Sequence, residues 1–449
     1  MHLRLLGPKR EAPVSRASSA TRSRRWAPTL RYAVLTALMV RLLVVAFVYR
    51  DFLEPGRDHW EFGYEMGMVA RSIATGHGFG NPYWGQTGPT ALITPVFPYL
   101  FAGIFCLLGI KTEAAALSVL ALNSLFSALT CLPLFFVAKK TLGDLAAEYA
   151  AWIWAFYPYA VYYSADSMWY HSMLCLLFTL LILVALHLES ATSLRVWAGF
   201  GFLSGLAALT SPVVLGVLPF VAGWVCYRLR KRASDWRRLL TGLGVAILGL
   251  LVTITPWLIR NYRTFHRFVF LKDNFWMEVS IGNAGNARHW WNGAVHPAGS
   301  PAQAVEFQRV GEQDYMAEKR LEALSFIQSH PGTYIWRCAR RIVFMWTGFW
   351  SFQPEYLREE PLDSVNIFFC TSFTWLALAG LRNAFREWPE IGIFYALIPG
   401  TFLIVYYLTH PELGYRQPIE PEVVILTAYA VVSRRKIRAQ EPLCEAQQN

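Results

Sequence analysis

Apolar runs of near-bilayer length dominate this sequence and limit what the chain can fold into. Hydrophobic residues make up 55% of the chain and charged residues only 16%, whereas soluble domains carry about 25% charge. A helix needs about 20 apolar residues to cross a bilayer, and these runs do not alternate as barrel strands do. The pattern predicts an all-α integral membrane protein. The runs lie at residues 31–49, 94–110, 115–138, 146–163, 168–188, 196–210, 212–227, 239–258, 336–352, 366–381, 391–408 and 419–433.

Basic residues lie in short segments beside these runs, in the stretches KREAPVSRASSATRSRR, RLRKRASDWRR and SRRKIR. The net charge is +11, but this placement is typical of the cytoplasmic loops of membrane proteins. We therefore expect a topology signal and no nucleic-acid partner. Arg22, Arg24 and Arg25 precede the first run, which places the N-terminus in the cytoplasm. The seven cysteines are scattered, which argues against a disulfide framework or a zinc site.

Two of the runs are predicted not to span the membrane. If residues 94–110 crossed it, Lys139 and Lys140 would lie outside, against the usual bias of basic loops toward the cytoplasm. This run begins TPVFPYLF, and its prolines suit an interfacial or broken helix better than a spanning one. Residues 336–352 contain three arginines, and a span there would place the SRRKIR tail outside.

The sequence thus predicts a polytopic helical bundle of about ten spans, with both termini in the cytoplasm. Juxtamembrane helices are expected in two large outside loops. The predicted division of the chain is a cytoplasmic basic segment 1–30, a transmembrane catalytic module 31–258 with the first outside loop 50–114, a second outside loop 259–365 with amphipathic helices, C-terminal transmembrane helices 366–433 and a cytoplasmic tail 434–449.

The first outside loop concentrates carboxylates near the membrane surface. A helix is expected from about Asp58 to Ala74, and the spacing of Asp58, Glu61 and Glu65 would place all three on one face of it. The alternative is an amphipathic helix with a solvated acidic face. Helices that bind lipid surfaces usually present lysine and arginine instead. The pattern therefore favours a catalytic or substrate-binding role for at least one of these carboxylates.

Aromatic and acidic residues elsewhere on the outer side are further candidates for substrate binding. Tyr83 and Trp84 lie in the glycine- and proline-rich stretch GHGFGNPYWGQTGPT, which sets an irregular backbone. They are placed to stack on a sugar, or equally to anchor the loop at the interface. Asp166 lies between two predicted spans, either as a turn residue or facing the first loop across a cleft.

Arginines at the ends of apolar runs on the outer side indicate an anionic partner. Arg260, Asn261, Tyr262 and Arg263 follow one run directly. Positive charge is disfavoured on this side, and a guanidinium group matches phosphate oxygens in a bidentate way. The sequence therefore predicts a phosphate site at the depth of a lipid headgroup. Tyr415 and Arg416 add to it, in the stretch THPELGYRQPIEP before the last span.

Few charged residues interrupt the predicted spans, and Arg41 and Glu148 are the clearest examples. We expect Arg41 to pair with a neighbouring helix or to extend to the interface. Two such charges are few for a proton-coupled transporter, and the sequence shows no internal repeat.

The order and placement of several motifs resemble those of the GT-C glycosyltransferases. These motifs are DHWEFGYEMGMVARSIATGHGF, GPTALITPVFPYL, TPWLIRNYRTFHRFV with NFWMEVSIGN, and YRQPIEP before the last span. The branch they resemble most is the bacterial one related to protein O-mannosyltransferases and lipid A aminoarabinose transferases. The resemblance covers nearly the whole chain. Gly414 stands where that family often has the first arginine of an Arg-Tyr-Arg element.

The resemblance implies transfer of a sugar, a hexose or a pentose, from a polyprenyl-phosphate donor on the periplasmic or extracellular side. Asp58 best matches the family's essential acid, with Glu61 next, and Arg260 matches a basic residue near the donor phosphate. The implied location is the bacterial inner membrane. The implied partners are the polyprenyl-phosphate-linked sugar, membrane lipids and an acceptor glycan, lipid or protein.

The chemistry expected is an inverting glycosyl transfer. Asp58 or Glu61 would act as general base on the acceptor hydroxyl, and arginines would stabilise the departing lipid phosphate. The cofactor is left open, because a divalent metal held by Asp58 and Asp166 fits the positions but no dedicated ligand set is evident. The alternative function is a non-enzymatic lipid or polysaccharide transporter or flippase.

Overall fold

Helices make up almost all of the regular structure in the computed structural model, which describes residues 19–48, 62–165, 167–191, 193–231, 236–283, 293–348, 351–359 and 363–445. Within these segments the β-structure is limited to one isolated bridge, between Gly80 and Pro89. The predicted all-α fold is confirmed. The helices are α1 Ser19–Val48, α2 Glu65–Ala74, α3 Val96–Leu108, α4 Glu113–Leu129, α5 Cys131–Leu142, α6 Asp144–Phe156, α7 Pro158–Ala165, α8 His171–Leu188, α9 Leu194–Ala208, α10 Val214–Lys231, α11 Trp236–Phe265, α12 Phe275–Ile281, η3 Gly293–Val295, α13 Pro301–Val310, α14 Glu312–Ser329, α15 Pro331–Thr347, α16 Pro354–Glu359, α17 Asp363–Glu387, α18 Pro389–Phe402, α19 Ile404–Leu408, η4 Leu413–Ile419 and α20 Glu420–Glu445.

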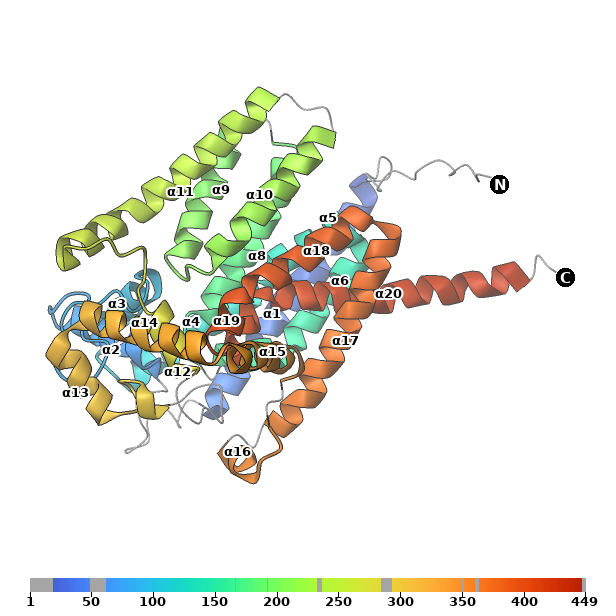
Figure 1. The fold of residues 1–449 in the computed structure, drawn as a ribbon. Coiled ribbons are helices and arrows are strands. Elements are labelled where there is room, and N and C mark those ends of the chain that lie inside the picture. Colours follow the sequence, from blue (N-terminus) through green and yellow to red (C-terminus); the bar gives the residue numbers. More distant parts are fainter. Residues whose placement is uncertain are drawn as a thin grey trace.

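Among the described residues, five helical segments are long and apolar enough to cross a membrane by length and composition: Thr29–Phe47, Glu113–Leu142, His171–Leu188, Trp236–Phe265 and Val365–Glu387. In contrast, α3 has 13 residues and α15 has 17. At about 1.5 Å per residue these two helices extend about 20 and 25 Å, less than the ~30 Å hydrocarbon core. The loop helices α2, α3, α12, α13 and α14 gather at one end of the molecule, away from the C-terminal part of α20 (Figure 1).

Glycines allow the long helices to pack closely. A Cβ atom built at Gly201 of α9 would lie 2.0 Å from the carbonyl oxygen of Ala246 in α11, and one at Gly380 of α17 would lie 1.9 Å from that of Leu426 in α20. No side chain fits at either position. Small residues at helix crossings are the usual means of association inside a membrane, where lipid is as apolar as the helix surfaces.

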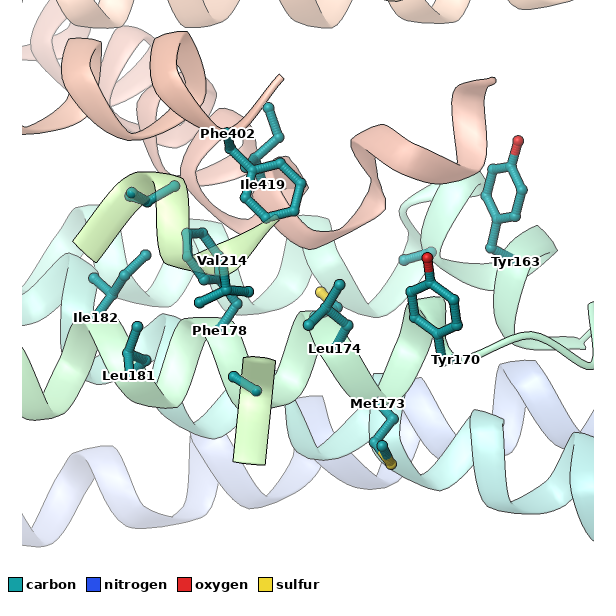
Figure 2. Packing of buried hydrophobic residues seen from close by; sticks show 14 of the residues in the cluster. Tyr163, Tyr170, Met173, Leu174, Phe178, Leu181, Ile182, Val214, Phe402 and Ile419 are labelled. Atoms are coloured by element: carbon teal, nitrogen blue, oxygen red, sulfur yellow. The ribbon is translucent and has the colours of Figure 1, made fainter. Parts of the chain in front are cut away.

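The apolar interior is continuous along α8. Its side chains from Met173 to Ile182 pack against residues from distant parts of the chain, including Phe402 and Ile419 (Figure 2). The same helix begins at His171, whose ring meets that of Tyr415 in η4, so one element links the bundle interior to that segment.

Arg41 of α1 is fully buried and occupies a break in the neighbouring helical path. Pro158 begins α7 and has no N–H group to donate to the carbonyl of Trp154 four residues earlier. The Tyr157 N–H reaches the Trp154 oxygen at 3.3 Å instead, and Arg41 adds further donors at this break: Nη2 donates to the Trp154 oxygen (3.1 Å), Nη1 to the Ala155 oxygen (3.1 Å) and Nε to Ser127 Oγ (2.9 Å). The expectation that Arg41 pairs with neighbouring helices is confirmed.

Two expected helix boundaries are wrong. The backbone at Gly63 and Tyr64 has φ values of 70° and 33°, in the left-handed region that an α-helix excludes, so α2 begins only at Glu65 and does not run on from Asp58 through these residues. Glu65 therefore does not belong to a face extended continuously from Asp58 and Glu61. The second boundary is the end of the apolar run 239–258. The helix α11 continues beyond it to Phe265.

Candidate functional site

Three segments far apart in the sequence meet in one cluster of buried and partly buried polar residues. The first segment is the start of α2, the second runs from the end of α11 to α13, and the third is the loop between α19 and α20. The outer junction, as we name it, consists of Glu65, Lys272, Glu278, His296, His410, Glu412 and Tyr415.

Glu65 begins α2 and is only 7% exposed. Burial is the main cause that raises its pKa to about 8, and Glu278 adds to the effect. His296 Nε2 lies 3.9 Å from Glu65 Oε1, and burial lowers the pKa of His296 to about 3. Both groups are therefore neutral near pH 7, and their contact is neither an ion pair nor a short hydrogen bond. Glu65 is accordingly a proton donor rather than a base at neutral pH.

Glu278, His410 and Tyr415 form a row of groups able to pass a proton. Asn274 Nδ2 donates to Glu278 Oε1 at 2.6 Å, which fixes the carboxyl group. The other oxygen lies 3.4 Å from His410 Nδ1, and His410 Nε2 lies 3.2 Å from the Tyr415 hydroxyl. Burial raises the pKa of Glu278 to about 7 and lowers that of His410 to about 3. A carboxyl group that titrates near neutrality suits general acid–base chemistry.

Lys272 supplies positive charge within the junction. It is partly buried, and burial lowers its pKa, while Glu278, Asp273 and Glu65 act in the opposite direction. Burial of an unpaired ammonium group is costly, so the neighbouring carboxyl groups account for its presence here. Removal of one acid would therefore change the charge state of the others.

Tyr415 lies within a group of aromatic rings. Its ring stacks on Tyr406 with centroids 4.3 Å apart, and it meets His171 edge to face at 6.0 Å. His171 is 2% exposed, and neither ring nitrogen has a hydrogen-bond partner. A Cβ at Gly414 would lie 2.7 Å from His171 Cε1 and 3.0 Å from Glu412 Oε1, so glycine is required for this approach.

A pair of buried acids joins the two large loops beside the junction. Glu312, the first residue of α14, accepts hydrogen bonds from the Thr90 hydroxyl and from the Ala91 N–H (2.5 Å) in the first loop. The Asp273 N–H donates to the Ala91 oxygen at 3.2 Å. Burial raises the pKa of Asp273 to about 6 and that of Glu312 well above its ordinary value. These contacts of Glu312 and Asp273 hold the first loop against the second.

Arg341 of α15 braces the other side of the junction. Its guanidinium group donates to Gly282 O (2.6 Å) and Asn283 Oδ1 (3.0 Å), just beyond the helix that carries Glu278. It also donates to Leu408 O (3.1 Å), two residues before His410. Sequence reasoning used the arginines of this run only as evidence against a span, although their number there was already a signal for polar partners.

The predicted acids Asp58, Glu61 and Asp166 lie outside the described residues. Of the predicted aromatic residues, Tyr83 is fully buried, with its ring against His296 and its hydroxyl near Met277 Sδ. Trp84 is 50% exposed, and Lys111 Nζ lies 5.8 Å from its ring centroid. Of these two, Trp84 is the one with surface available to a ligand.

The predicted arginines differ in what they contact. Arg260 is partly buried and donates to the carbonyls of Thr90 (2.7 Å) and Phe79 (2.6 Å), so it fastens the first loop to α11. Arg263 is exposed. Arg416 is 1% exposed, and its Nε lies 2.6 Å from Glu420 Oε1, which places its charge against a carboxylate rather than an open surface.

Asn261 and Tyr262, the two residues between Arg260 and Arg263, differ in their exposure. Asn261 is fully buried and donates to the carbonyls of Val269 (3.3 Å) and Leu271 (3.4 Å), so it shapes the turn after α11. Tyr262 is 60% exposed. The expected loop at 260–263 is instead the last helical part of α11.

In the segments that the structure describes, no group of three or more histidine, cysteine, aspartate or glutamate residues has the arrangement of a metal site. Asp58 and Asp166, proposed for a divalent cation, fall outside those segments. The residues that sequence reasoning missed are Lys272, Glu278, His296, His410 and Glu412. The only signal for them was the presence of titratable groups in the outside loops.

The fold is similar to that of a solved membrane enzyme. The oligosaccharyltransferase AglB of Archaeoglobus fulgidus, in complex with an inhibitory peptide and a dolichol-phosphate, matches with a TM-score of 0.52 and 14% identity, over 95% of this chain and 52% of that chain. This chain thus spans about half the length of AglB. The likeness shows that this chain, over nearly its whole length, shares a helical membrane fold with that protein.

ArnT of Cupriavidus metallidurans, bound to undecaprenyl phosphate, gives a TM-score of 0.37 at 15% identity, over 93% of this chain and 79% of that chain. The sequence matches no protein-family model and no curated protein sequence.

Proposed function

We propose that this protein is a membrane glycosyltransferase that moves a sugar from a polyprenyl-phosphate donor to an acceptor on the outer side of the membrane. The observation that carries the proposal is the match of nearly the whole chain to the fold of an oligosaccharyltransferase complexed with dolichol-phosphate. The polar outer junction supports it, because its acids lie in the outside loops, where a lipid-linked substrate would present its sugar.

The general base in this proposal is Asp58 or Glu61. Both precede Phe62, the first described residue of the loop that leads into the junction at Glu65. An ionised carboxylate takes the acceptor proton as the acceptor oxygen bonds to the anomeric carbon. The bond from that carbon to the phosphate oxygen breaks on the opposite face, which gives inversion and releases polyprenyl phosphate.

The residues of the junction have complementary roles in this proposal. Protonated Glu65 donates a hydrogen bond to a sugar oxygen, since its pKa of about 8 keeps the proton in place at neutral pH. Glu278 and His410 carry a proton toward Tyr415 along their row of contacts. The half-exposed Trp84 packs on a sugar ring.

The donor phosphate in this proposal first meets Arg263, which is exposed on the last turn of α11. Arg260, less than one turn earlier, holds the loop carbonyls of Phe79 and Thr90 and adds positive charge behind the site. Arg416 acts through Glu420, since the two form a buried pair. The location proposed is a bacterial inner membrane with both termini in the cytoplasm.

Substitution of the two candidate bases tests this function. In proteoliposomes supplied with a polyprenyl-phosphate-sugar donor, Asp58→Asn should lower the release of polyprenyl phosphate by about 10²–10⁴-fold if Asp58 is the base. Glu61→Gln is tested beside it, because the sequence does not separate the two. Binding of polyprenyl phosphate and the melting temperature should stay close to wild type.

Glu318→Gln is the control, since Glu318 is exposed on α14 and away from the first loop. Loss of turnover in Glu61→Gln alone would move the base to that residue. Full turnover in both Asp58→Asn and Glu61→Gln would contradict carboxylate base catalysis by the first loop.

A further inference from the structure

A hollow of about 540 Å³ lies between α1, α6 and α17, away from the outer junction. Its walls are mostly apolar and aromatic, and they include Tyr149, Trp152, Phe156, Tyr157 and Phe373. Trp152 and Phe156 stack with centroids 6.5 Å apart, and both remain substantially exposed. Exposed aromatic side chains on a helix of a membrane bundle face lipid, so the hollow opens toward the bilayer.

Glu148 is the one acidic residue among those that line the hollow. Within the described part of the chain, no hydrogen bond or ion pair involves its side chain. Asp144, one turn earlier, is paired with Lys139 at 3.2 Å, so that lysine is already engaged with a different acid. A carboxylate at a lipid-facing position is costly unless a cation meets it, and the described residues that line this hollow include no lysine or arginine.

The length of the hollow along α6 is close to the depth of one leaflet of a bilayer. From Glu148 to Phe156 the lining residues cover eight residue steps of α6, which corresponds to about 12 Å. The hydrocarbon core is about 30 Å thick, so one leaflet contributes about 15 Å. Glu148 lies at the end near Lys139 and Lys140, the side that the positive-inside pattern assigns to the cytoplasm.

We propose that this hollow is a binding site for a phospholipid of the cytoplasmic leaflet whose headgroup carries a primary ammonium group. The ammonium group pairs with Glu148, and one acyl chain lies along Trp152 and Phe156 as far as Tyr157. An anionic headgroup would meet the carboxylate with like charge. The site is separate from the glycosyl transfer proposed above, and neither proposal depends on the other.

Native mass spectrometry of the full-length protein tests the site. The protein is purified in mild detergent and given equal amounts of phosphatidylethanolamine and phosphatidylglycerol with the same acyl chains. Wild type should retain the ethanolamine lipid in preference. Glu148→Gln should lower the ratio of the two bound lipids by about fivefold, the size expected for a partly exposed ion pair, and Glu148→Lys should invert the preference.

Two matched variants separate charge from shape. Glu113→Gln removes an exposed acid at the start of α4 and should leave the ratio unchanged. Ile153→Phe adds volume inside the hollow and should lower retention of both lipids. An unchanged ratio in both Glu148 variants would overturn the headgroup assignment, and unchanged retention in Ile153→Phe would overturn the site. Displacement of both lipids by undecaprenyl phosphate, independent of Glu148, would assign the hollow to the donor chain instead.

Discussion

The bundle interior around Arg41 and the outer junction around Glu65 both bury charged groups, yet they treat them in opposite ways. Arg41 donates to the hydroxyl of Ser127 and to helix carbonyls beside the break before α7. In the outer junction, burial raises the pKa values of Glu65 and Glu278 and lowers that of Lys272. A buried charge whose hydrogen bonds are satisfied stabilises a fold, whereas buried acids with shifted pKa values keep protons available near neutral pH.

The sharpest way to test this contrast is to remove the Arg41 donors. Arg41→Leu keeps apolar bulk at this position but removes the donors to Ser127 Oγ, Trp154 O and Ala155 O. We expect a loss of about 3 kcal/mol in the free energy of unfolding, the usual cost of breaking a buried charged network. Denaturant unfolding in a fixed detergent measures it, with Arg31→Leu at an exposed position of α1 as the control. Equal losses in the two variants would show that Arg41 is no more structural than a surface arginine.

The outer junction should instead make the free energy of unfolding depend on pH. Folded Glu65 keeps its proton up to about pH 8, whereas the unfolded side chain ionises near pH 4.5. The folded state therefore binds the extra proton, and its stability falls as pH rises through this window. From pH 6.5 to 8 the contribution of Glu65 amounts to about 2 kcal/mol, at about 1.4 kcal/mol per pH unit.

Glu65→Gln removes this contribution, so its unfolding free energy should fall less than that of wild type between pH 6.5 and 8. The other titrating groups are present in both proteins and largely cancel in the difference. Parallel pH curves for wild type and variant would mean that Glu65 is ionised in the folded protein throughout this range.

The smallest effect is expected at the edge of the junction region. Trp84 is half exposed, so Trp84→Ala should change the unfolding free energy by less than about 0.5 kcal/mol. If the ring packs on a sugar, the KM for the donor or acceptor should rise a few-fold while kcat stays nearly constant. A large stability loss would place Trp84 with the structural residues, beside Tyr83.

The fold could be predicted well from the sequence, because apolar run length and the placement of basic segments report directly on the membrane. Arg41 was also interpretable, since a lone charge in an apolar run needs a partner. The start of the first-loop helix could not be predicted, because the positive φ values at Gly63 and Tyr64 depend on packing that the local sequence does not show.

The composition of the junction was only partly predictable. Glu65 and Tyr415 were expected from their neighbours in the chain, but Glu278 and His410 lie 132 positions apart and meet only in the folded protein. Their roles follow from burial, which shifts each pKa and which the sequence does not display. For Arg260 the residue type indicated an anion, whereas the folded chain gives its guanidinium two backbone carbonyls.

The two regions also differ in when they can form as the chain leaves the ribosome. The partners of Arg41 all lie within the first 155 residues, so that contact is available early in synthesis. The junction links Glu65 to the loop of His410 and Tyr415, and it closes only after nearly the whole chain has been made. The N-terminal part of the bundle can therefore form before the groups of the outer junction come together, so shorter chains carry part of the framework without the site.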